Sequence, residues 1–319
     1  MKYKYGLSFL ILLSLSITSI FIGASTLTIR DIISGDSHQL MILVVSRLPR
    51  VISILLTGIG LSISGLVMQR ITHNRFVSPT TAATINFAQL GMLLALLFFT
   101  SATLFQRLSF AFLLAIIGSL LFLELARRIK FQVPIFVALT GMILGNVVTS
   151  FTTFLAYQNN LVQNVSSWTQ GSFTNILQGN FELIYISLPF ILLAFVFANK
   201  FTIVGMGEEF AKNLGLNYRL YVNFGLIIVS AITASIVVTV GSISFVGLII
   251  PNLVSIRFGD NLTNSFGLTA IFGAGFLLVC DILGRLILFP FEIPISLTVG
   301  ILGSVLFLFM LLRRKIYAT

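Results

Sequence analysis

Two arginines stand three residues apart in the segment SRLPRVISILLTG (46–58), where a long uncharged stretch begins. In a helix, Arg47 and Arg50 lie one turn apart and share a face, and Pro49 between them is tolerated in a first helical turn. Charged side chains beside lipid are rare and need a reason. The pair is either an anchor that extends to the lipid headgroups or a contact for a partner.

A second polar segment, NKFTIVGMGEEFAKNLGLNYR (199–219), holds a candidate contact for another protein. Between two glycines it contains EEFAKNL, which is long enough for a short helix. On that helix Phe210 and Leu214 share an apolar face, and Glu208 can pair with Lys212 at i,i+4. A small amphipathic helix of this kind can sit in a partner's groove. The alternative is a solvated connector.

Other kinds of chemistry find little support in the residues. Glu124 and Asp281 are the acidic residues inside apolar stretches, so no relay of ionisable groups for ion-coupled transport is visible. Asp281 precedes Arg285 by four residues, a spacing that predicts an ion pair. No lysine follows a glycine, as a P-loop requires, so any ATP must bind another subunit. His38 and His73 lie far apart, and we expect no metal site.

The composition identifies the solvent of this chain as lipid. Of its 319 residues 57% are hydrophobic and 9% charged, and the mean hydropathy is +1.07. A soluble domain carries about 25% charged residues. The net charge of +10 indicates basic loops that stay in the cytoplasm, because no basic stripe interleaved with aromatic residues suggests nucleic acid. The single cysteine excludes a disulfide within the chain.

Apolar runs of about 20 residues, the length that crosses a bilayer, position these polar groups. Ten runs are predicted to span the membrane: 6–24, 51–69, 83–100, 109–126, 133–157, 183–199, 220–240, 242–256, 266–284 and 294–312. The run 242–256 is short and is a candidate for a broken or re-entrant segment. The first run follows MKYKY and resembles a signal peptide, but a retained helix is favoured because the rest of the chain is also apolar.

The distribution of basic residues sets the orientation. With both termini inside, fourteen Lys and Arg residues are cytoplasmic and five remain outside: Arg30, Arg47, Arg50, Arg107 and Arg285. The excess of positive charge inside favours this arrangement. Arg47 and Arg50 therefore lie on the outer side, where positive charge is not expected.

Five segments together resemble a known family: SRLPR, ISGLVMQ, GMGEEFAKNLG, GSISFVGLIIPNLVSIRFG and EIPISLTVGILG. They are similar, in the same order and over nearly the whole chain, to the permease subunits of bacterial ABC importers for iron–siderophores, haem and cobalamin. Members of this family have ten helices and work as permease dimers above two ATPase subunits. A binding protein delivers the chelate from outside.

The resemblance implies roles for particular residues. The short helix would dock into the ATPase, which assigns coupling to Gly207, Glu208, Glu209, Phe210, Lys212, Leu214 and Gly215. Acidic residues of the binding protein would pair with outer arginines, which correspond here to Arg47, Arg50 and, in LCDILGRL, Arg285. The family's cytoplasmic gate would lie near Pro134 and Ile135, on a looser alignment.

Two segments depart from the family pattern. The usual NPLADPGLLG is NRFVSPTTAA (74–83) here, and Asn252 replaces the histidine that usually follows IP. The first departure resembles a subgroup linked to catecholate or mixed catecholate siderophores, which favours an iron chelate over cobalamin.

The sequence therefore predicts an all-α membrane protein of about ten transmembrane helices, with both termini cytoplasmic and residues 1–319 forming one permease domain. The ATPase-coupling loop covers about 200–219. The expected function is import of ferric siderophore without chemistry on the cargo. The expected partners are ATPase subunits that bind Mg-ATP, a second permease of identical or sister sequence, and an extracellular binding lipoprotein or periplasmic protein. A haem or cobalamin permease is the alternative within the family, and an ion-coupled secondary transporter is the alternative outside it.

Overall fold

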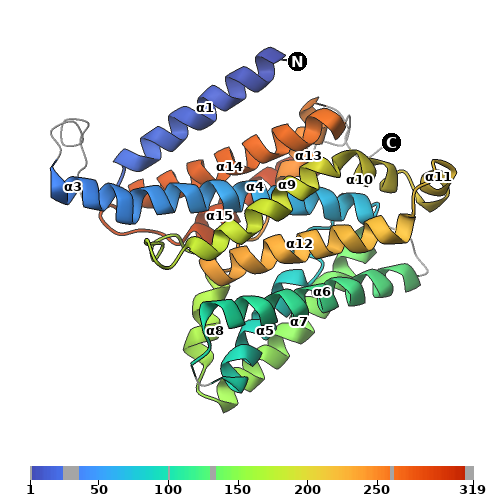
Figure 1. Ribbon diagram of the computed structural model, residues 1–319, viewed down its shortest axis with the longest axis horizontal. Coiled ribbons are helices and arrows are strands. Elements are labelled where there is room, and N and C mark those ends of the chain that lie inside the picture. The colour runs from blue at the N-terminus through green and yellow to red at the C-terminus, as the bar shows by residue number, and fades with distance from the viewer. Residues whose placement is uncertain (1, 24–35, 100, 130–133, 259–261, 313–319) are drawn as a thin grey trace.

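The computed structural model describes residues 2–23, 36–99, 101–129, 134–258 and 262–312, and over these ranges the chain contains helices and no strand (Figure 1). The longer helices run roughly alongside one another in a bundle. The short helices α3 (Ser37–Ile42) and α11 (Glu208–Asn213) lie at opposite ends of this bundle (Figure 1). We refer to these as the α3 end and the α11 end.

The remaining helices and helical turns make up the rest of the described fold. In chain order they are α1 (Lys2–Phe21), the π-helical turn η1 (Leu43–Arg47), α4 (Leu48–Ile71), α5 (Thr84–Phe98), α6 (Leu104–Arg128), α7 (Pro134–Gln158), α8 (Val162–Thr169), the 3-10 turn η2 (Glu182–Ile186), α9 (Ser187–Val196), α10 (Ala198–Val204), α12 (Tyr218–Val240), α13 (Val246–Phe258), α14 (Leu262–Leu286) and α15 (Ile295–Leu312). Local signals fix several ends: Thr103 and Gln106 form a capping box at the start of α6, and Asn217 caps α12.

Every one of the ten predicted apolar segments contains helix. Within the described residues, six helices are long and apolar enough to cross a membrane, or seven if one bent pair counts as a single span. Three more helices, α1, α5 and α13, have shorter apolar stretches. The all-helical membrane class is confirmed, while the number of ten crossings stays a prediction.

The helix that carries the two arginines begins earlier than predicted. The segment 51–69 was expected to start after Arg50, but the helical run extends from Ser37 to Ile71. Pro49 has no N–H to donate to the carbonyl of Val45, and the chain adapts through the π-helical turn η1. The N–H of Gln178 donates to that carbonyl instead, at 2.9 Å. The arginines do not end the helix because their charges are satisfied inside the protein.

Two other boundaries differ from the prediction. The expected single span 183–199 is divided into a part ending at Val196 and the helix α10, which meet at an angle of 62°. The short run 242–256 is helical from Val246, and the preceding residues form a connection that is not helical. The hydropathy of the sequence predicts neither the bend nor this connection, because it contains no information about backbone direction.

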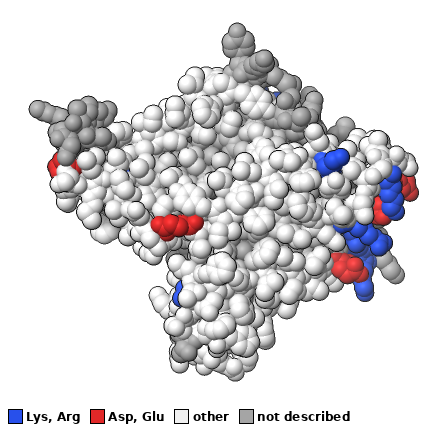
Figure 2. All heavy atoms as spheres, viewed as in Figure 1, with Lys and Arg blue, Asp and Glu red and all other residues white. Residues whose placement is uncertain are grey.

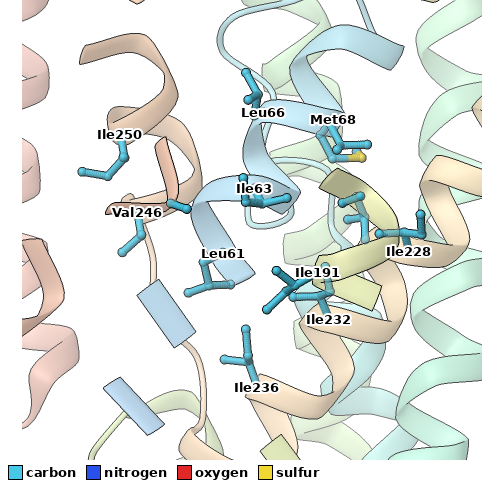
Figure 3. Packing of buried hydrophobic residues seen from close by; sticks show 14 of the residues in the cluster. Leu61, Ile63, Leu66, Met68, Ile191, Ile228, Ile232, Ile236, Val246 and Ile250 are labelled. Carbon is cyan, nitrogen blue, oxygen red and sulfur yellow. The ribbon is translucent and has the colours of Figure 1, made fainter. Parts of the chain in front are cut away.

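Small residues let α4 pack at the centre of the bundle. A Cβ added to Gly65 would lie 1.8 Å from the carbonyl oxygen of Gly247 on α13, and one added to Gly58 would lie 2.6 Å from backbone atoms of α14. These contacts are possible only because glycine has no side chain. Around them, isoleucine, leucine and valine side chains of α4, α9, α12 and α13 fill the interior (Figure 3).

Candidate functional site

A buried cluster of charged side chains lies near the α3 end, and we call Arg47, Arg50, Asp281, Arg285 and Glu292 the ionic cluster. Arg50 is its centre, and is 8% exposed. Its Nε and Nη2 donate to one oxygen of Asp281, at 3.2 and 2.8 Å. Its Nη1 donates to both oxygens of Glu292, at 2.9 Å each. The planar guanidinium thereby holds two carboxylates in fixed directions, which a lysine does not do.

Arg285 binds the same aspartate from the other side and joins it to the first helix. It forms an ion pair with Asp281 one helical turn earlier on α14, as the i,i+4 spacing predicted. Its Nη1 also donates to the backbone carbonyls of Ser19, at 2.9 Å, and Ile22. Arg285 is 2% exposed, so the ion pair and these carbonyls together compensate the loss of water around its charge.

Arg47 completes the contact with the end of α1. Its Nη1 donates to the carbonyl of Ile22 at 2.9 Å, the acceptor that Arg285 also uses. A Cβ on Gly23 would overlap the Arg47 guanidinium, so any side chain there would displace that guanidinium from its present position. Arg47 and Arg285 thus converge on carbonyls at the C-terminal end of α1, where a helix carries partial negative charge, while Arg50 binds the two carboxylates. The structure brings together the three residues expected to dock the binding protein, and the docking role itself stays a prediction.

Glu292 is the member of the cluster nearest solvent. It follows α14, in the connection to α15, and its side chain also accepts from the Thr174 hydroxyl at 3.0 Å. Burial raises the pKa of Glu292, but the charge of Arg50 and the hydrogen bonds from Arg50 and Thr174 outweigh burial and hold that pKa below its usual range. The carboxylate therefore stays ionised and bridges α4 to the loop that contains Thr174.

The expected coupling helix is confirmed as a structural element. Gly207 and Gly215 flank α11 with positive φ values of 112° and 73°, which glycine adopts without strain. Glu208 and Lys212 pair at 2.8 Å, and this pair lowers the pKa of Glu208 through the hydrogen bond and the charge of Lys212. The basic side chains visible on this face of the molecule gather mainly at the α11 end (Figure 2).

Phe210 of α11 and Leu214, the residue that directly follows the helix, lie open to solvent. Phe210 is 44% and Leu214 55% exposed, whereas the neighbouring Ala211 is buried against the bundle. Glu209 is exposed as well. An exposed phenylalanine on this short helix and an exposed leucine at its C-cap offer a partner an apolar contact rimmed by charge. The ATPase-coupling role of the segment 207–215 stays a prediction.

The two residues expected at the gate have different surroundings. Pro134 begins α7, and its carbonyl accepts from the Asn74 side chain at 2.6 Å. It lines a cavity of about 350 Å³ at the α11 end, together with Arg127 and Tyr218. Ile135 is 61% exposed and does not line that cavity. The structure leaves the gate role of both residues as a prediction.

The acidic partners of the arginines were the residues that the sequence did not identify. Asp281 was predicted to bind Arg285 but not Arg50, which lies 231 residues away in the chain. Glu292 begins the segment EIPISLTVGILG, for which the family resemblance predicted no role. One signal was available: charged groups beside lipid need partners, and the chain has nine acidic residues in all.

Long apolar helices packed through glycine, with charged groups concentrated near their ends, define an integral membrane protein of the α-helical class. The FecCD transport family profile matches residues 9–313, and the chain belongs to that family. Among its relatives, the petrobactin import system permease protein YclN of Bacillus subtilis (strain 168) is 52% identical and covers 100% of both chains. The ferric-anguibactin transport system permease protein FatD of Vibrio anguillarum is 39% identical, over 94% of this chain and 96% of the relative.

A solved structure agrees with this assignment. A metal-chelate type ABC transporter in an inward-facing conformation superposes with a TM-score of 0.83 and 25% identity, over 98% of this chain and 100% of that one. The protein is therefore a permease subunit of an ABC importer, a transport component and not an enzyme, in the cytoplasmic membrane. A permease of this kind implies ATPase subunits, a binding protein and a second permease.

Proposed function

We propose that this chain is the permease through which a ferric siderophore, possessing catecholate groups, enters the cell. The observation that carries the proposal is the 52% identity over the full length to a permease named for petrobactin import. The ferric-anguibactin relative supports the same class of cargo. A haem or cobalamin permease is the alternative, and the relative named for vitamin B12 import is 28% identical.

The topology that fits this function has ten crossings in a single domain of residues 1–319, with both termini and the α11 end in the cytoplasm. The basic character of the α11 end supports this orientation (Figure 2). The ionic cluster then faces the outside, where the loaded binding protein arrives. Closure of the ATPases around Mg-ATP moves α11, and the bundle passes this movement to the pathway between two permeases, identical or sister chains.

The cargo is tested by uptake of radiolabelled iron presented on a panel of chelators, in cells with and without this chain. We expect uptake that depends on the chain for a catecholate siderophore and no dependence for haem or cobalamin. Uptake of cobalamin alone would contradict the proposal.

The energy source is tested at the exposed face of α11. Replacing both Phe210 and Leu214 with Asp removes the apolar contact, and we expect loss of ATPase association and of uptake, with insertion unchanged. The matched control replaces Asn213 and Asn217 with Asp, which adds the same two charges outside that face and keeps a capping side chain at the start of α12. Normal uptake by the Phe210/Leu214 variant would exclude this face of α11 from the transport mechanism.

A further inference from the structure

His73 stands just past the C-terminus of α4, in a backbone conformation that usually belongs to glycine. Its φ is +50°, in the left-handed region. The N–H of Asn74 donates to the carbonyl of Gln69, and the N–H of His73 to that of Arg70. These two bonds are the Schellman arrangement that ends many helices, with glycine favoured where His73 stands. Glycine would end this helix with less strain, so the imidazole calls for a separate explanation.

The ring of His73 joins both ends of the segment that carries α11. Its Nδ1 lies 3.2 Å from the carbonyl oxygen of Gly205, two residues before Gly207. Its Nε2 lies 3.2 Å from the hydroxyl of Tyr218, the first residue of α12. A carbonyl only accepts, so Nδ1 carries a proton, and in the neutral ring Nε2 accepts from the Tyr218 hydroxyl. Movement of either end of this segment therefore displaces the ring.

The two residues after His73 connect to other helices. The Asn74 side chain donates to the carbonyl of Pro134, the first residue of α7, at 2.6 Å. The carbonyl of Arg75 accepts from the Asn252 side chain of α13 at 2.8 Å. Asn74 is buried, so breaking its bond would leave polar groups without water. Three consecutive residues thus tie the α11 segment to α7 and α13.

Space on both sides allows this turn to shift. His73 lines the cavity of about 350 Å³, together with Pro134 and Tyr218. His73 also lines a second cavity of about 150 Å³, together with Gly205 and Asn252. A close-packed interior resists displacement, whereas a hydrogen-bonded turn between two cavities can move as a unit.

We propose that His73 is a positioning residue that transmits the movement of α11 to the start of α7, through its bonds to Gly205 and Tyr218 and the adjoining bond from Asn74 to Pro134. The inference rests on the proposed function, because it takes α11 as the contact with the ATPase. Without the ring, ATP hydrolysis continues but moves α7 less, so iron crosses less often for each ATP consumed.

The test uses the complete transporter in liposomes, with its ATPase, its partner permease and its loaded binding protein. His73→Gly removes the ring while keeping, and relaxing, the helix stop. Tyr218→Phe removes one hydroxyl and keeps the aromatic ring. The matched control, Tyr221→Phe, removes a hydroxyl one turn further along α12, where the ring packs on Phe197. Each variant is measured for ATPase association, ATP hydrolysis and iron imported per ATP hydrolysed.

We expect association and hydrolysis to stay near wild type in all variants. Iron imported per ATP falls roughly two- to tenfold in Tyr218→Phe and at least as far in His73→Gly, the range that loss of one hydrogen bond allows. The double variant loses no more than His73→Gly, because both changes remove the same bond. Tyr221→Phe is unchanged.

Two results would overturn the inference. One is an unchanged ratio of iron to ATP in both variants, and the other is a parallel loss of association, hydrolysis and uptake, which a purely structural role produces. Failure of the wild-type complex to import iron would instead contradict the proposed function, so the two failures are distinguishable.

Discussion

Glu292 offers the sharpest test of whether the binding protein docks through Arg50. The Glu292 carboxylate occupies the Nη1 side of the Arg50 guanidinium, with both of its oxygens at 2.9 Å. A carboxylate of an arriving protein would have to share or displace it. Glu292→Gln keeps the shape and removes the charge. Docking through Arg50 therefore predicts tighter capture of the binding protein by this variant.

The size of the effect follows from the exposure of the pair. The Glu292 side chain is 19% exposed, so its pairing with Arg50 is weaker than a fully buried one. Ion pairs open to solvent contribute about 0.2–1 kcal/mol, which corresponds to roughly 1.5- to 5-fold in affinity. We expect a gain of this size in capture, mainly in the association rate and larger at low salt.

Replacing Arg50 itself is a weaker test. Asp281 is 3% exposed and would keep only Arg285 as its charged partner. Removing one member of a buried ion pair costs about 3–5 kcal/mol. A change to Glu would add a third carboxylate to the same place. Lost capture by such a variant would not separate docking from unfolding, whereas Glu292→Gln leaves the inner pair intact.

The assay measures capture of loaded binding protein by the complex in nanodiscs, across a range of salt, with thermal unfolding followed in parallel. Glu182→Gln is the matched control: it removes the same charge from a side chain that accepts from the N–H of Gly179. A gain in Glu292→Gln but not in Glu182→Gln supports docking through Arg50. Slower capture in Glu292→Gln, with unfolding unchanged, refutes docking through Arg50. The ionic cluster would then serve to hold α1 against the bundle.

Three further predictions concern stability and orientation. The folded pKa of Glu292 lies below its unfolded value, so its contribution to stability is complete above the unfolded pKa and is lost as pH falls through the folded pKa. In thermal unfolding, the melting temperature of Glu292→Gln should therefore fall less at acid pH than that of wild type. Gly65→Ala should force α4 from α13 and cost about 1–3 kcal/mol, while Gly300→Ala, whose Cβ meets nothing within 4 Å, should cost nothing; denaturant unfolding compares them. With Cys280 changed to Ser, a cysteine within 158–164 should react with an impermeant thiol reagent on intact cells and one at Asn217 only after lysis, and the reverse pattern would invert the topology.

Local patterns in the sequence were sufficient to predict the membrane helices and the short helix α11. Apolar length predicts a membrane helix because a helix in lipid satisfies its backbone internally. Two glycines around EEFAKNL predict a short helix because the turns at Gly207 and Gly215 need positive φ. Such features involve neighbouring residues and can be read from a short window.

The contacts that give the arginines their environment could not be predicted in this way. Arg50 meets Asp281 and Glu292 only after the chain has folded back across 231 and 242 residues. The start of α4 was misplaced for the same reason, since a charge satisfied by distant partners no longer marks a helix end. His73 did leave a local signal: a helix stop occupied by histidine instead of glycine, followed by two polar residues.

One helix links the two regions to which partners are assigned. Arg50 lies in the first turn of α4 and His73 just beyond its end, about 35 Å apart at 1.5 Å per residue. Between them Gly58 and Gly65 hold α4 in backbone contact with α14 and α13, so α4 resists bending and moves with its neighbours. A binding protein at the α3 end and an ATPase at the α11 end then act on the same rigid unit, α4 with its neighbours. Coupling between two binding equilibria is reciprocal, so a change that weakens the His73 contact must also weaken the influence of the binding protein on nucleotide binding by the ATPase.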